Sequence, residues 1–98
     1  MSRRLNDAQI ADAVDALGQW QRVGDGIEAD LKFDSFSTAF GFMAAIAIHA
    51  ERLCHHPDWS NVYDRVHVRL TTHDAGGLTS LDFELAGIIE EIVGRFSK

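Results

Sequence analysis

The chain has little cysteine, proline or positive charge and no long apolar run, and each shortage excludes a class of protein. Its one cysteine, Cys54, cannot form a disulfide within the chain, so this is not a disulfide-bonded secreted scaffold. Nine basic against 15 acidic residues give a net charge of −6, which argues against DNA or RNA as a direct ligand. No segment approaches the ~20 apolar residues of a membrane span, and no signal-peptide pattern is present. We therefore expect a cytoplasmic protein that binds neither nucleic acid nor membrane.

The rest of the composition is that of one globular domain covering residues 1–98. Apolar residues make up 46% of the chain and charged residues 24%, which is ordinary for a globular protein. No linker or repeat is visible, and Pro57 is the only proline. A chain of this size buries about two thirds of its unfolded surface, which is enough for one core.

Apolar periodicity and capping residues predict two helices in the first half of the chain. The first follows Asn6, which can cap it in a capping box, and it stops at Gly18. The second extends over residues 36–53, with Asp34 or Ser35 as its cap. Apolar residues spread around most of this second helix, so we expect it to be largely buried. They are Phe36, Ala39, Phe40, Phe42, Met43, Ile46, Ala47, Ile48, Ala50 and Leu53.

Two β-hairpins alternate with these helices. Residues 20–23 and 27–33 are expected strands around a glycine-rich turn, and residues 59–63 and 66–72 form the second pair. Apolar and polar side chains alternate along the returning strand of each hairpin, so one face is predicted to be buried.

A third helix completes the chain, with Thr79 as its cap and Asp82 at the capping-box position. The order α-β-β-α-β-β-α predicts an α+β fold in which three helices cover one face of a four-stranded antiparallel sheet. The sheet edges would stay open in so small a chain. We therefore expect pairing with a second copy.

Three histidines are the residues best suited to chemistry, because the predicted topology brings them together. His55 and His56 end the second helix, and the second hairpin returns His73 to the same end. Glu51 lies one helical turn before His55, and Trp59 offers a flat wall with one hydrogen-bond donor. The loop after His73 forms the rim. The expected site residues are His55, His56, His73, Glu51, Trp59 and Asp74.

Three uses of this cluster compete. A zinc site would combine the histidines with Cys54 or Glu51, but adjacent histidines rarely converge on one metal, and no CxxC or HExxH spacing is present. We therefore expect no metal. Histidines that only cap a helix or occupy a turn are the alternative without chemistry. General acid–base catalysis is favoured, because imidazole exchanges protons near neutral pH and Glu51 can orient one ring.

The segment Glu51-Arg-Leu-Cys-His-His-Pro-Asp-Trp-Ser-Asn-Val-Tyr63, followed by Thr72-His73 and Gly77-Leu78, resembles the pterin-4a-carbinolamine dehydratase family. The resemblance implies loss of water from a 4a-hydroxytetrahydropterin to give quinonoid dihydropterin, without a cofactor. It also implies a link to aromatic amino acid hydroxylases, whose pterin is recycled in this way. Family members form homodimers through their sheets and commonly homotetramers through helices.

The resemblance also implies roles for single residues. His55 and His73 would act as acid and base, and His56 would mainly bind the substrate. The animal enzymes carry an acidic residue where this chain has Cys54, so Glu51 becomes the candidate for orienting an imidazole. We expect Asp82 to act mainly as a cap. Animal members also serve as dimerisation cofactors of a homeodomain transcription factor, so a binding or assembly module is the alternative function.

Overall fold

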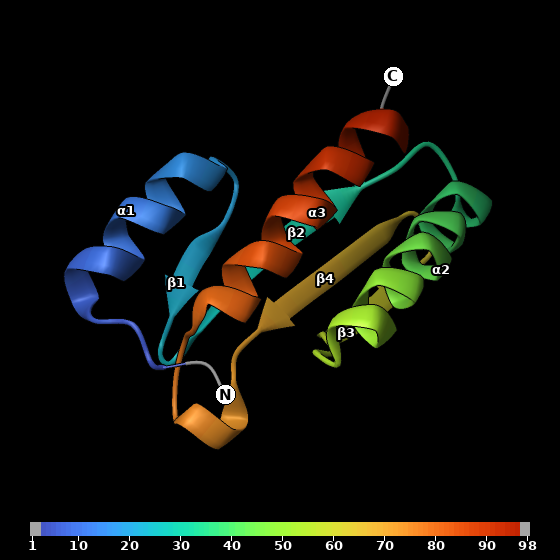
Figure 1. Ribbon diagram of the computed structural model, residues 1–98. Helices are drawn as coiled ribbons and strands as arrows, with labels where there is room; N and C mark the ends of the chain where they lie inside the picture. The colour runs from blue at the N-terminus through green and yellow to red at the C-terminus, as the bar shows by residue number, and fades with distance from the viewer. Residues whose placement is uncertain (1–2, 97–98) are drawn as a thin grey trace.

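The computed structural model describes residues 3–96. Within this range, three helices lie against one face of a four-stranded sheet (Figure 1). In chain order the elements are α1 (Asp7–Leu17), β1 (Gln21–Val23), β2 (Gly26–Lys32), α2 (Phe36–Leu53), β3 (Asp58–Val62), β4 (Arg65–Leu70), the 3₁₀ turn η1 (His73–Ala75) and α3 (Ser80–Phe96). This order and the α+β class confirm the prediction from the sequence.

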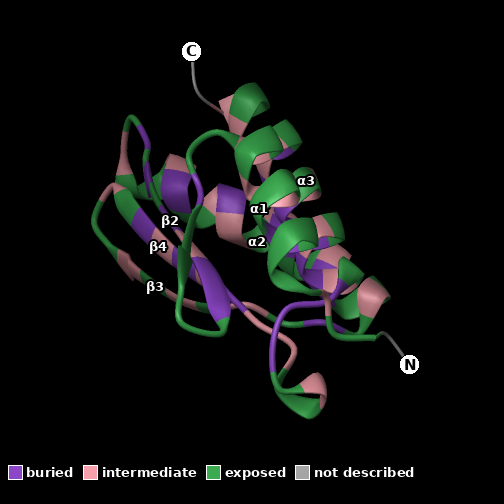
Figure 2. Cartoon of the chain, turned by 90° about the vertical axis from the view of Figure 1, so that its left-hand side faces the viewer, coloured by how far each residue is buried: buried purple, intermediate pink, exposed green. Residues whose placement is uncertain are grey.

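The sheet is antiparallel, with its strands in the order β1-β2-β4-β3. The two central strands pair from Ile27 with Leu70 to Lys32 with Arg65. Their alternating apolar residues are buried beneath the helices, as predicted (Figure 2): Ile27, Ala29, Leu31, Val66, Val68 and Leu70. Because Asp58 at the start of β3 pairs with Arg69, the end of β4 lies beside the residues that follow α2.

The helix ends follow the predicted caps. The Asn6 side chain accepts a hydrogen bond from the Gln9 amide at 2.8 Å, and the Gln9 side chain accepts one from the Asn6 amide at 2.8 Å. Gly18 ends α1 with a φ of 83°. Ser35 rather than Asp34 caps α2, because its hydroxyl accepts a hydrogen bond from the Thr38 amide at 3.2 Å.

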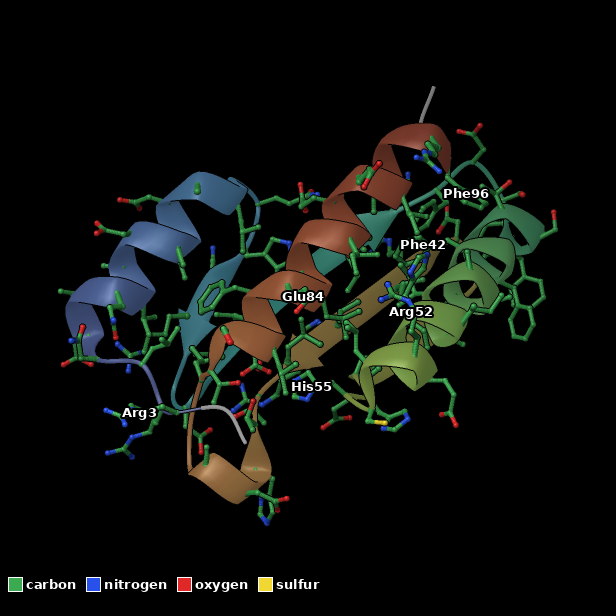
Figure 3. All side chains as sticks on the ribbon, in the orientation of Figure 1. Arg3, Phe42, Arg52, His55, Glu84 and Phe96 are labelled. Atoms are coloured by element: carbon green, nitrogen blue, oxygen red, sulfur yellow. The ribbon has the colours of Figure 1, made fainter. Side chains whose placement is uncertain are left out.

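The prediction that α2 is largely buried is wrong. Phe42 is fully buried and packs against the rings of Phe33 and Phe96, with centroids 4.9 and 6.2 Å away. Figure 3 shows Phe42 on α2 and Phe96 near the end of α3. Phe40 and Ile48 on the other side are 57% and 72% exposed. A helix lying on a sheet and one neighbouring helix has only part of its circumference covered, so the remaining apolar residues face outward.

No helix within residues 3–96 is long and apolar enough to cross a membrane.

Candidate active site

His55 is placed by the way α2 ends. Cys54 caps the helix with a φ of 53°, which is uncommon for a residue other than glycine. Its amide donates to the carbonyls of Ala50 and Glu51, and the His55 amide donates to Ala50 at 3.0 Å. These bonds turn the chain back on itself. The His55 side chain therefore points inward and is only 9% exposed.

Asp82, in the first turn of α3, is the partner of His55. The residue is fully buried, and its Oδ1 lies 2.6 Å from Nε2 of His55. Its Oδ2 accepts hydrogen bonds from the Thr72 hydroxyl at 2.7 Å and the Thr79 amide at 2.9 Å. A carboxylate only accepts hydrogen bonds, so Nε2 of His55 carries the hydrogen. The other ring nitrogen, Nδ1, is then the one left to exchange a proton.

His56 faces a different carboxylate. Its Nε2 lies 3.0 Å from Oε1 of Glu51, and both side chains are largely exposed. From the sequence, we predicted that Glu51 orients an imidazole. The structure pairs it with His56, whereas the buried carboxylate at His55 belongs to Asp82, which was expected mainly as a cap.

His73 begins the 3₁₀ turn η1, directly after the hairpin that was predicted to return it towards His55. The chain leaves β4 after Leu70, and Thr72 then pairs with Gly77 through bonds of 3.1 and 3.3 Å between their main chains. Within this closure, Gly76 adopts a φ of 74° and donates its amide to the His73 carbonyl at 3.0 Å. The exposed His73 side chain is thus presented at the end of the hairpin that also leads back to His55.

A cavity of about 350 Å³ joins these elements. All three predicted histidines and Asp74 line it, as does Ala75 from the loop that was expected at its rim. Thr71, Thr72 and Leu81 were not among the expected site residues. The lining residues are Cys54, His55, His56, Thr71, Thr72, His73, Asp74, Ala75 and Leu81. Leu81 and His55 both line the cavity, so Leu81 gives it an apolar surface.

Two predicted residues lie outside the cavity lining. Glu51 reaches the site only through His56. Trp59 is half-buried on β3 and packs against the hydrophobic core, so its indole forms part of the wall of the fold. Within residues 3–96, no three histidine, cysteine, aspartate or glutamate side chains are arranged to hold a metal ion.

A separate histidine–carboxylate cluster lies on the sheet face away from the helices. Nδ1 of His67 lies 2.7 Å from Asp30, and Nε2 lies 3.3 Å from Glu28. The hydrogen bond to Asp30 is the main cause that raises the pKa of His67 above 6.5; partial burial opposes it, and the charges of Asp30 and Glu28 add to it. Arg69 also bonds Glu28, at 2.8 Å. This histidine does not line the cavity.

Comparison with known proteins identifies the family. A family model described as pterin 4 alpha carbinolamine dehydratase matches residues 3–92. A Bordetella avium protein provisionally named pterin-4-alpha-carbinolamine dehydratase is 47% identical over 97 residues, covering 97% of this chain and 90% of its own. A Brucella ovis protein with the same provisional name is 49% identical over 94 residues, covering 93% of this chain and 96% of its own.

Two solved structures share the fold. A Brucella melitensis protein described as a transcriptional coactivator/pterin dehydratase superposes with a TM-score of 0.92 at 46% identity, over 94% of this chain and 100% of its own. A pterin dehydratase-like RuBisCO assembly factor of the alpha-carboxysome has a TM-score of 0.63 at 19% identity, over 81% and 89%, and shows the fold alone. Because the family model and close relatives span nearly the whole chain, the protein belongs to the pterin 4 alpha carbinolamine dehydratase family.

Proposed function

We propose that this protein is a hydro-lyase that removes water from a 4a-hydroxytetrahydropterin. The observation that carries the proposal is the buried His55–Asp82 pair, which opens on a cavity shared with His56 and His73. Family membership supports the same reaction. In a cytoplasmic setting, the product would return to the pterin cycle of aromatic amino acid hydroxylases.

The reaction needs two proton transfers and no change of redox state. The C4a–O bond breaks as the hydroxyl takes a proton and leaves as water. N5 then loses its proton, and the electrons of the N5–H bond form the C4a–N5 double bond of quinonoid dihydropterin. Each transfer by a positioned group typically contributes ~10²–10⁴-fold to the rate.

The residues that line the cavity can be assigned to these two proton transfers. With Nε2 of His55 held by Asp82, Nδ1 is left to accept the N5 proton, and the carboxylate stabilises the imidazolium that forms. His73, on the η1 turn that also lines the cavity, is left to protonate the leaving hydroxyl. We assign His56, held by Glu51, to substrate binding, and Asp74 to the polar edge of the ring. Leu81 offers the ring an apolar surface.

The test is the rate of dehydration of synthetic 4a-hydroxytetrahydropterin, followed by absorbance. The wild type should exceed the buffer rate, and His73→Ala should lose about 10²-fold or more. His67→Ala is the matched control, because that histidine lies outside the cavity. A wild type no faster than buffer, or an equal loss in both variants, would refute the proposal.

We also propose that the protein forms homodimers or homotetramers. The outer side of α2 exposes Phe36, Phe40 and Ile48, at 50%, 57% and 72%, and β3 is an edge strand. Exposed apolar surface and open strands favour pairing with a second copy. Light scattering should report more than one copy for the wild type and fewer for Ile48→Glu. A wild type that stays a single copy would contradict this and favour use of the same side of α2 in a binding or assembly module.

A further inference from the structure

We propose that Arg4 is a positioning residue for His73. The inference rests on the proposed function, in which His73 donates a proton. The turn that carries His73 lies between two cavities. One is the candidate active site, which His73, Asp74 and Ala75 line. The other, of about 380 Å³, is lined by Arg4 and Leu5 together with the Gly76–Leu78 segment.

The N-terminal segment holds the turn from this second side. The Leu5 amide donates to the Leu78 carbonyl at 2.8 Å, and Nη1 of Arg4 lies 3.4 Å from the Gly76 carbonyl oxygen. The stem of Arg4 lies directly on Gly77: a Cβ at that position would be 2.8 Å from Cδ and 3.3 Å from Cγ of the arginine. Leu5 itself packs against the hydrophobic core, so the segment is anchored to the body of the fold.

The turn needs such support because two adjacent glycines close it. Glycine has more backbone freedom than other residues, and Gly76 and Gly77 are the residues through which the chain returns from His73 to α3. The amide bond from Gly76 to His73 and the pairing of Thr72 with Gly77 close the turn internally. The Arg4 stem covers Gly77 from outside. Its removal should let the turn, and with it the imidazole, sample other positions.

The first experiment compares Arg4→Ala with Arg3→Ala. Arg3 is the neighbouring exposed arginine (Figure 3), so both variants lose one positive charge from the same segment. Arg4→Ala should lower kcat about tenfold with a smaller change in KM, because misplacing a catalytic group slows the chemical step. Arg3→Ala should stay near the wild-type kcat. Equal kcat values for the two variants in an active enzyme would overturn the proposal.

A double-mutant cycle with Gly77→Ala tests the contact itself. Gly77 is not among the glycines with a positive φ, so alanine can adopt its backbone, and the new methyl group would meet the Arg4 stem. Gly77→Ala should therefore lower kcat in the wild-type background and do so less in the Arg4→Ala background. If the reduction in kcat of the double variant equals the product of the two single reductions, the two residues act independently, and the proposed role of their contact is wrong.

An NMR measurement made without substrate tests this inference independently of the proposed function. The NMR resonances of the His73 imidazole should shift or broaden in Arg4→Ala and remain at their wild-type positions in Arg3→Ala. If the wild type has no dehydratase activity, the proposed function fails, and these resonances still decide whether Arg4 holds the turn. Unchanged His73 resonances in Arg4→Ala would overturn the inference.

Discussion

The imidazole of His55 lies 2.6 Å from the carboxylate of Asp82, a residue 27 positions away in the chain and fully buried. The same carboxylate accepts a hydrogen bond from the Thr79 amide at the start of α3. One side chain therefore both begins a helix and fixes the tautomer of a candidate catalytic histidine. The structural role of Asp82 and its role in the site can be separated by substitution.

Asp82→Asn should lower kcat by about 10²-fold or more, because an amide NH₂ facing Nε2 of His55 would favour the opposite tautomer. Its amide oxygen can still accept the Thr79 amide, so the helix start is retained. Steady-state kinetics and thermal unfolding on the same preparation would measure both effects. Glu84→Gln, an exposed carboxylate on the same helix, is the control. A wild-type kcat in Asp82→Asn would contradict the assignment.

Glu51→Gln should have a much smaller effect on kcat, less than about twofold, because exposed ion pairs contribute little. Glu51 and His56 are both largely exposed at 3.0 Å. Their pairing should matter mainly for how His56 meets the substrate, so any change should appear in KM. Kinetics of Glu51→Gln and His56→Ala, alone and combined, would check this. A loss of kcat as large as that of Asp82→Asn would mean that Glu51 takes part in the chemical step.

His67 should make the folded state relatively more stable at low pH. Its pKa is raised above 6.5, chiefly by the hydrogen bond to Asp30. A group whose pKa rises on folding contributes its full stabilisation below the unfolded value and loses it as the pH passes the folded one. The urea midpoint of the wild type minus that of His67→Gln should therefore decrease as the pH rises above 6.5.

The His67 side chain is 41% exposed, so the effect should shrink at high salt. Subtracting the variant removes the contribution of the titratable groups that do not contact His67, because their surroundings are the same in both proteins. Arg69 also forms an ion pair with Glu28, which is a partner of His67, and Arg69 is unchanged in the variant. A difference between wild type and variant that does not vary with pH would contradict the prediction.

Phe42→Ala should cost about 3–5 kcal/mol of unfolding free energy, as expected for a large buried aromatic side chain. Phe42 is fully buried and contacts two other phenylalanine rings. Phe40→Ala, on the exposed side of α2, should cost much less at concentrations where light scattering reports a single copy. Urea unfolding of both variants would measure the difference. Equal costs would mean that Phe40 is also part of the monomer core.

The helix boundaries could be predicted because their signals are local. The capping box of Asn6 and the end of α2 at Leu53 depend on residues within about one turn of the cap. The exposed side of α2 could not be predicted in the same way. Phe40 and Phe42 have the same side chain, and apolar residues surround the helix. Only the position of the sheet and α3 determines which ring is covered.

The candidate site also has features that could be predicted from the sequence and features that could not. The three histidines and the likeness to a dehydratase family can be read directly from the sequence. The proximity of the histidines also follows from it, because a hairpin must return the chain to the end at which it began. The tertiary structure was needed to show that Asp82, not Glu51, holds His55 and that Trp59 packs against the core. Contacts between residues far apart in the chain depend on how α3 packs against α2, which no local pattern records.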